Sequence, residues 1–319
     1  QITVYDDGGT YVRDLWRTNQ ASAIAYPYSL LGMGAITTST AGTGYYYFMY
    51  DWEVSKPAIT CATQRTQAVA TVAAVRVAPK VALDGPYDPG TGLMSDALRQ
   101  AGLVPLVEPF SNLGFTHYGE GGEEAISFYI LDTTGVNAMV DWVMVELRDP
   151  VDPSIVVSTR SAVLQRDGDV VDLDGSSPVA FGVPAGNYHV SIRHRNHLGC
   201  MTSTPLSLST TATALDFTSP SMPTWGTAAR RNVNNKMVLW SGNTVRDGDL
   251  KYTGGGNDRD PILVRIGGVV STATMPGYHV EDVNLDGTTK YTGANNDRDL
   301  ILQNIGGLVP TNIRSEQLP

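Results

Sequence analysis

The sequence predicts a mostly β protein built from short strands and many turns. The chain has 319 residues, of which 33 are glycine and 18 are proline, so turns are frequent. Its apolar segments are rich in Val, Ile, Thr and Tyr, which favour strands over helices. Hydrophobic residues make up 42% of the chain and charged residues only 17%, a balance that excludes a disordered chain. A chain of this length is expected to hold two or three domains.

The charge and the hydropathy of the chain argue against nucleic-acid and membrane partners, whereas its two cysteines leave their redox state open. The formal net charge is −10 and the pI is about 4.9, which repels nucleic-acid phosphates and anionic membrane surfaces. The most apolar stretch, around 21–36, is interrupted by Pro27 and two glycines, so no membrane span is expected. Cys61 and Cys200 allow either one disulfide or two buried thiols, and both possibilities stay open.

Residues 1–57 are expected to form an N-terminal β segment that does not stand alone. Residues 44–54 alternate with the period of a strand, and aromatic side chains such as Tyr45 and Tyr46 fall on both faces. Such a strand has to be covered on both sides, and residues 1–57 provide little cover. We therefore expect the tail of a larger domain, or strands that pair with a second copy of the chain. Residues 58–74 are expected to be a linker.

Residues 75–218 are expected to form a β-sandwich with one short helix. The clearest pair of strands is 138–148 and 155–165, joined by a turn at 149–153 that contains Asp and Pro. The short helix is expected to have Ser95 as its N-cap, to bury Leu98 and to end just before Gly102.

The end of this segment carries a first resemblance. A turn at 183–187 is followed by Tyr188, Val190 and Ile192 in strand alternation. This stretch resembles the last strands of immunoglobulin-like domains of the transthyretin and carboxypeptidase-regulatory type, and the resemblance implies an immunoglobulin-like sandwich. Residues 219–224, which are rich in Ser and Pro, are expected to be a second linker.

The C-terminal segment, 225–319, contains a duplication. At an offset of 39 residues, Asp247 to Gly268 matches Asp286 to Gly307, with 15 of 22 positions identical. Each copy is a glycine-containing acidic loop followed by a short apolar helix, with Asp258 or Asp297 expected as the N-cap. Helices this short are unstable alone, so something else has to hold the pair together.

The loop of the second copy has the spacing of a calcium site. Asp282, Asn284 and Asp286 occupy the first, third and fifth positions, and Gly287 occupies the sixth, where the chain turns sharply. Thr288 is expected to offer its carbonyl, and Lys290 its carbonyl or a bridging water. The carboxylate that would stand at the twelfth position is absent, so we expect Asp297 or Asp299 to close the site across an inserted stretch.

The first copy has fewer ligands at the same positions. Val245 stands at the third position, and Asp249 at the seventh is expected to compensate or to leave a weaker site. Turns rich in Asp, Asn and Gly also form without an ion, and this alternative stays open for both loops. The predicted Ca²⁺ ligands are Asp282, Asn284, Asp286, Thr288, Lys290, Asp297 and Asp299 in the second copy, and Asn243, Asp247, Asp249, Asp258 and Asp260 in the first.

Three other polar clusters are expected to be structural. His194 and His197 lack a third ligand and are flanked by arginines, so we expect them to pack on carboxylates. An acidic turn could hold another cation, but a structural hairpin turn explains it more simply. In a glycine-rich loop a paired-carboxylate hydrolase would need two acids held a fixed distance apart, which a sequence does not show. Their polar residues are Asp167, Asp169, Asp172 and Asp174 in the turn, and His117, Glu120, Glu123 and Glu124 in the loop. No common catalytic or nucleotide-binding motif occurs in the chain, so no enzyme activity is expected.

The paired loop and helix units resemble dockerin modules, the calcium-folded pairs found at the ends of secreted proteins. The resemblance implies a small duplicated calcium-binding domain over 225–319. The sequence of 75–319, including both Asn-Asp-Arg-Asp motifs, resembles the C-terminal regions of large surface proteins of Bacteroidetes that are exported by the type IX secretion route. This second resemblance implies an extracellular location at the cell surface.

The sequence as a whole therefore predicts a non-enzymatic, extracellular structural or adhesive protein with a calcium-stabilised C-terminal domain. Self-association into a fibre through the N-terminal strands is expected within this class, as is contact with a surface protein or glycan. The first alternative is a carbohydrate-binding module that stacks sugars on Tyr46 and Trp52. The second is a fragment of a secreted hydrolase.

Overall fold

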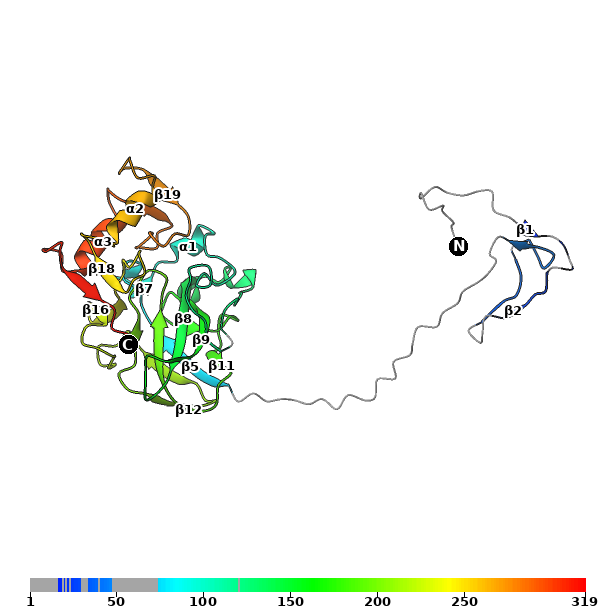
Figure 1. Ribbon diagram of the computed structural model, residues 1–319, viewed down its shortest axis with the longest axis horizontal. Coiled ribbons are helices and arrows are strands. Elements are labelled where there is room, and N and C mark those ends of the chain that lie inside the picture. The colour runs from blue at the N-terminus through cyan, green and yellow to red at the C-terminus, as the bar shows by residue number, and fades with distance from the viewer. Residues whose placement is uncertain are drawn as a thin grey trace. The chain divides into compact units, whose positions relative to one another are not determined.

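The computed structural model describes residues 17–18, 20, 22, 24–29, 34–39, 41–47, 74–119 and 121–319. The chain forms two compact units, Gln1–Val69 and Ala70–Pro319 (Figure 1). The described residues are β-rich, as the sequence predicts, with 32% strand and 10% helix. Within the described ranges, no helix has the length and apolar character needed to cross a bilayer.

The first unit contains short paired strands. They are β1 Arg17–Thr18 with β4 Tyr46–Tyr47, and β2 Tyr28–Ser29 with β3 Ala35–Ile36. The rings of Tyr26, Tyr28 and Tyr46 pack together, with centroids 4.8 to 6.1 Å apart. The rest of the predicted aromatic strand from residue 48 onward, including Trp52, lies outside the described residues, as do Cys61 and the linker up to residue 73.

The second unit is organised around a six-stranded antiparallel sheet of order β10-β9-β8-β12-β13, with β14 also paired to β12. Its strands are β8 Met139–Arg148, β9 Val156–Gln165, β10 Val170–Val171, β12 Gly186–Arg193, β13 Cys200–Met201 and β14 Leu206–Leu208. The predicted hairpin of β8 and β9 is confirmed, with Val145 opposite Arg160. Asp149 closes its turn by accepting the N–H groups of Val151 and Asp152.

Strand β8 is buried along its whole length. Val143 and Val145 belong to the main core. On the alternate face, the indole N–H of Trp142 donates to the carbonyl of Pro105 at 2.9 Å, so the loop that contains Pro105 covers this side. A strand covered on both faces needs its polar side chains paired, and the pattern of the sequence does not identify the partners.

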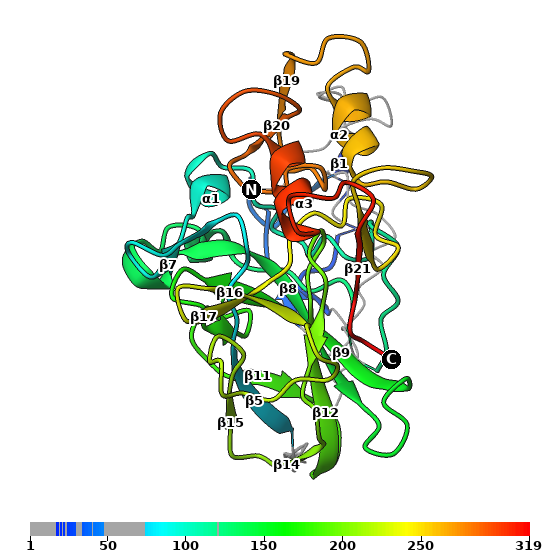
Figure 2. The ribbon, with the colours of Figure 1, turned by 90° about the vertical axis from the view of Figure 1, so that its left-hand side faces the viewer.

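A second sheet shares the core of the first. It has three strands in the order β11-β5-β15, namely β5 Val75–Lys80, β11 Val179–Phe181 and β15 Thr213–Asp216. Strand β15 runs parallel to β5, and β11 runs antiparallel to it. Val77 and Phe181 from this sheet and Val163 and Leu164 from the larger one join a single apolar cluster. Figure 2 shows the smaller sheet and β14 at one end of the unit.

Short elements connect β5 to β8. They are the hairpin β6 Tyr87–Asp88 and β7 Leu93–Met94, the helix α1 Ala97–Gln100, and the 3₁₀ turns Phe128–Ile130 and Gly135–Asn137. Leu98 is buried and Gly102 follows the helix with φ +66°, both as predicted. The predicted N-cap, Ser95, was wrong, because the helix starts one residue later. Asp96 precedes it, and its carboxylate pairs with Arg99 at 2.6 Å.

The C-terminal segment begins with the hairpin β16 Arg230–Val233 and β17 Lys236–Leu239. The two copies of the repeat follow. The first contains β18 Asp249–Lys251 and α2 Arg259–Arg265, and the second contains β20 Thr288–Lys290 and α3 Asp297–Asn304. Strand β19 Thr274–Pro276 pairs with β20, and the last strand, β21 Ile313–Ser315, pairs with β18. The short helices predicted from the repeat are therefore confirmed.

The repeat and the sheets belong to the same compact unit. Leu239 of β17 donates its N–H to the carbonyl of Ala82 at 2.8 Å, and Thr202 forms a bridge with Thr224. The linker expected at 219–224 therefore joins two packed parts of one unit. Figure 2 shows α2, α3, β19 and β20 gathered at the end opposite the smaller sheet.

Candidate metal centre

The asparagine of the shared Asn-Asp-Arg-Asp motif accepts a backbone N–H at the start of each repeat helix. The side chain of Asn296 accepts the N–H of Asp299 at 2.9 Å at the start of α3, and Asn257 accepts that of Asp260 at 3.0 Å at the start of α2. Of the two predicted caps, Asp258 does stand at the N-cap position of α2, although its side chain makes no cap hydrogen bond, whereas Asp297 was wrong, because it is the first residue of α3. An asparagine oxygen satisfies the helix N–H equally well, which leaves the following aspartate free to turn into the loop.

The two turned aspartates occupy equivalent places in the two loops. Asp297 is fully buried, and its carboxylate oxygens accept the N–H groups of Val283 and Lys290, each at 2.7 Å. Asp258 is also fully buried and accepts the N–H groups of Val245 at 3.0 Å and Lys251 at 2.8 Å. Each carboxylate therefore ties the start of its loop to the strand that follows.

The second loop folds around Asp282 as the spacing predicts. Asp282 is buried and accepts the N–H groups of Asp286 at 3.1 Å and Gly287 at 2.8 Å. Gly287 has φ +85°, which glycine adopts without strain. Asp286 accepts the N–H of Thr288 at 2.9 Å and the amine of Lys290 at 2.8 Å. The Lys290 side chain thus neutralises a carboxylate of the loop, a role that the sequence analysis did not assign to it.

Burial makes the carboxylates of the second loop electrostatically costly. It raises the pKa of Asp297 to about 8, and the neighbouring charge of Asp282 adds to the shift. Burial also raises the pKa of Asp282 to about 6, although the charge of Arg195 opposes the shift. Two buried carboxylates that repel each other favour a cation between them.

Asp299 and Asp260, the other residues predicted to close the sites, have carboxylates that bond at the start of their helices, where Asn296 donates to Asp299 at 2.9 Å and Asn257 donates to Asp260 at 2.8 Å. Asp299 pairs with Arg298 at 2.8 Å and its side chain is 48% exposed, while Asp260 pairs with Arg259 at 3.0 Å. The two arginines also lie over tyrosine rings, Arg298 over Tyr291 and Arg259 over Tyr252. Of the two residues that the sequence left open in the second copy, Asp297 is therefore the one that closes the loop.

The first loop has the same frame with fewer charges. Burial raises the pKa of Asp258 to about 6, and the charge of Asp247 adds to the shift. Asp249 is bound to Ser315 at 2.6 Å and to Lys251 at 2.9 Å, so its carboxylate is committed to β18 and β21. The side chain of Asn243 is 7% exposed, and its oxygen accepts no hydrogen bond from any described residue. A buried amide oxygen without a donor is one that water or a cation can satisfy.

The donor set fits a hard divalent cation such as Ca²⁺. Both loops present carboxylate, amide and backbone oxygens, and neither includes a thiol or an imidazole among its predicted ligands. Over the described ranges, no three or more His, Cys, Asp or Glu side chains gather in a metal-binding group. In the structure the buried carboxylates of Asp258 and Asp297 accept N–H groups of their own loops. The predicted ligands also include the side-chain amide oxygens of Asn243 and Asn284.

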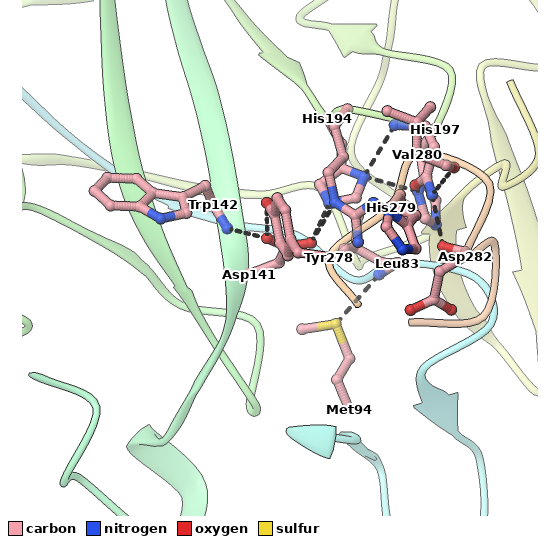
Figure 3. Close-up of polar contacts among 12 residues, drawn as sticks. Leu83, Met94, Asp141, Trp142, His194, His197, Tyr278, His279, Val280 and Asp282 are labelled. Carbon is pink, nitrogen blue, oxygen red and sulfur yellow. Dashed lines mark hydrogen bonds and ion pairs between the residues drawn. The ribbon is translucent and has the colours of Figure 1, made fainter. Parts of the chain in front are cut away.

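A buried polar network fixes the loops to the sheet (Figure 3). Asp141 of β8 accepts hydrogen bonds from Arg195 Nε at 2.9 Å, His194 Nε2 at 3.1 Å and the hydroxyl of Tyr278 at 2.6 Å. Although burial opposes it, the charge of Arg195 together with the bond from His194 holds the pKa of Asp141 well below its usual range. As expected from the sequence, His194 packs on a carboxylate, together with Arg195. His197 does not, because its ring nitrogens contact His194, the side-chain oxygen of Asn196 and the carbonyl of Asp84.

The remaining polar clusters support local turns. Asp167 and Asp174 accept backbone N–H groups two and three residues later, as structural turns require. In the glycine-rich loop, Glu124 accepts the N–H of Ser161 at 3.1 Å, and His117 lies 3.7 Å from Glu108. Glu120 lies outside the described residues. The sequence analysis missed Asp141 and Glu108. The only signal for Asp141 is a charge within an apolar strand, which demands a buried partner.

Comparison with known proteins adds no relative. No protein-family model, no curated protein and no solved structure matches the chain. The argument for function therefore rests on the loops themselves.

Proposed function

We propose that the chain is a non-enzymatic, extracellular structural or adhesive module whose two duplicated loops bind Ca²⁺. The observation that supports this proposal is the pair of equivalent buried carboxylates, Asp258 and Asp297, each of which lies near a second carboxylate, Asp247 or Asp282, whose charge helps to raise its pKa. Burying a carboxylate without a cation costs free energy. A cation bound in the folded state would remove that cost and stabilise the unit.

Each loop has its own set of ligands in this proposal. Asp282, Asn284, Asp286 and Asp297 would hold the ion of the second loop, and Asn243, Asp247 and Asp258 that of the first. Bound calcium would supply positive charge among buried carboxylates and would cross-link the start of each loop to its helix. Calcium sites of extracellular modules commonly have dissociation constants of about 10⁻⁴ to 10⁻³ M. Sites that work at such concentrations suit a protein outside the cell.

The finer description of the fold also belongs to this proposal. We infer that the two sheets with their shared core are an immunoglobulin-like sandwich, and that the repeat is a dockerin-like module packed on it. The resemblance of 75–319 to surface proteins exported by the type IX route supports the extracellular assignment. The duplicated loops support the dockerin-like assignment, although the inserted stretch before Asp297 departs from the usual dockerin spacing.

Thermal melting of the full chain tests the calcium proposal. Calcium at about 100 times its dissociation constant stabilises the folded state by about 2.7 kcal/mol per loop, which corresponds to about 5 to 11 °C in Tm. We expect chelation with EDTA to lower the Tm by such an amount for each loop. In Asp297→Ala, the part of this calcium-dependent shift in Tm that comes from the second loop should be lost. Asp299→Ala is the matched control, because both oxygens of the Asp299 carboxylate are already bonded, to Asn296 and to Arg298, and the calcium-dependent shift should persist in it.

The same preparation gives an independent readout. Metal analysis of protein purified without chelator is expected to find up to two calcium ions per chain, and fewer in Asp297→Ala. A chain that holds no calcium and melts at the same temperature with and without EDTA would contradict the proposal.

A further inference from the structure

One buried side chain outside the repeat contacts the beginning of the second loop. Asn196, in the connection between β12 and β13, is 1% exposed. Its amide nitrogen donates to the carbonyls of Val280 and Asp282, each at 2.8 Å. Asp282 is the first residue of that loop, so these bonds fix the point where the loop leaves the preceding chain.

The backbone of Asn196 contacts the beginning of the first loop. Its carbonyl accepts the N–H groups of Gly242 and Asn243, each at 3.0 Å. Asn243 is the repeat equivalent of Asp282, 39 residues earlier. A single residue therefore binds the first position of both loops, through its side chain on one side and its main chain on the other.

Asn196 and its neighbours also have contacts outside the loops. The carbonyl of His279 accepts a hydrogen bond from Arg195, whose guanidinium also binds Asp141 and stacks on the ring of Tyr278 at 4.2 Å. The side-chain oxygen of Asn196 lies 2.8 Å from Nδ1 of His197, and Nε2 of that histidine lies 2.8 Å from the carbonyl of Asp84. The segment that connects the two loops thus also contacts β8 and the turn at Asp84.

We propose that Asn196 is a shared positioning residue that couples the two loops, so that a cation in one loop strengthens binding in the other. The inference rests on the proposed calcium function. Binding requires each first position to be fixed, and fixing it costs conformational entropy. A cation in the second loop orders Asp282 and thereby the amide of Asn196. The carbonyl of Asn196 is then already placed for Asn243, so the first loop has less disorder to lose.

Calorimetric titration of the full chain with Ca²⁺ tests this coupling. Asp258→Ala removes the first loop and Asp297→Ala removes the second, and each is measured with and without Asn196→Ala. With Asn196 present, we expect loss of one loop to weaken calcium binding at the other by about 5-fold or more. With Asn196→Ala, we expect that factor to fall to about 1. A residue with only a structural role would lower stability without changing the factor.

Matched variants keep the test decisive. Gln165→Ala removes another buried amide, which donates to the carbonyl of Gly175 far from the loops, and it should leave the coupling unchanged. Asn196→Ser is a milder variant that serves if Asn196→Ala does not fold. Two ions that bind independently in the unsubstituted chain, or coupling that persists in both Asn196 variants, would overturn the inference while leaving the calcium function intact. A chain that binds no Ca²⁺ at all would overturn both.

Discussion

The two copies of the repeat share a hydrogen-bonding frame but differ in the groups that a cation would meet. In both, an asparagine caps the helix and the next aspartate ties the start of the loop to the following strand. The first loop position is the neutral Asn243 in one copy and the buried Asp282 in the other. The third position is Val245 in one and Asn284 in the other. The residues that the copies share therefore set the geometry, and those that differ set the charge.

Because of this difference, electrostatic repulsion destabilises the second loop more than the first when calcium is absent. Asp282 and Asp297 are both buried there, and only Arg195 from outside the repeat opposes their charge at Asp282. In the first loop Asp258 is a buried carboxylate, and the position of Asp282 is taken by Asn243, a neutral amide whose oxygen accepts no hydrogen bond from any described group. We therefore expect the second loop to depend more strongly on its cation, and three experiments compare the two directly.

The largest effect expected is a fall in stability of the calcium-free chain as the pH rises from about 4 to 8. Burial raises the pKa of Asp297 to about 8, whereas an unfolded aspartate has a pKa of about 3.9. Below the unfolded value both states are protonated and the stabilisation is fully present. It is lost progressively as the pH rises through the folded value, because the unfolded chain has already released the proton.

Melting curves in EDTA over this pH range check the difference between the loops. The corresponding loss for Asp258, whose pKa burial raises to about 6, ends near that pH. We expect Asp297→Asn to flatten the fall between pH 6 and 8 and Asp258→Asn to leave that part unchanged. Equal effects of the two substitutions above pH 6 would show that the copies carry the same electrostatic load.

An intermediate effect is expected when the first loop is given the missing ligand of the second. Val245→Asn adds an amide oxygen at the third position, and calcium affinity rises with the number and charge of the ligands. We expect the first loop to bind Ca²⁺ about 10-fold more tightly, which is about 1.4 kcal/mol. Titration calorimetry measures the change, with Val245→Ala as the control that alters volume without adding oxygen. Identical affinities in both variants would refute a ligand role for this position.

The smallest effect is expected at the lysines. Lys290 pairs with Asp286 at 2.8 Å, and Lys251 pairs with Asp247 at 3.3 Å, both as partly exposed i,i+4 pairs. Exposed pairs of this kind contribute about 0.2 to 1 kcal/mol, so Lys290→Met is expected to tighten calcium binding at the second loop about 2-fold. Lys251→Met is the repeat-matched comparison and should act on the first loop alone. Calorimetry at two salt concentrations gives the readout, since salt screens such pairs, and a change at the wrong loop would contradict this assignment.

The elements that sequence reasoning predicted well are those with local signals. The hairpin of β8 and β9 has alternating apolar residues around a turn of Asp and Pro, and the repeat helices have their apolar stripes. The cap of α3 was assigned wrongly because Asn296 and Asp297 are adjacent and both residue types cap helices well. Only the fold decides which of the two turns inward.

The contacts that Asn196 and Arg195 make could not be predicted from the sequence, for a different reason. Asn196 binds Asp282 across 86 residues, and Arg195 binds Asp141 across 54. No spacing rule relates residues at such separations, because their proximity depends on how the sheets and the repeat pack. A polar segment such as 194–197 indicates only that partners are needed once it is buried.

The pairing of β18 with β21 bears on the order in which the chain folds. The last strand of the second copy completes the first, since Asp249 lies opposite Ser315, and Thr253 donates to the carbonyl of Pro310 at 2.9 Å. A nascent chain that has emerged only as far as Gly268 therefore lacks the partner strand of its first copy. Contacts over such sequence distances form slowly, because the intervening chain has to close into a loop first. The two copies are thus expected to fold together, late, and only after residues 313–315 have been synthesised.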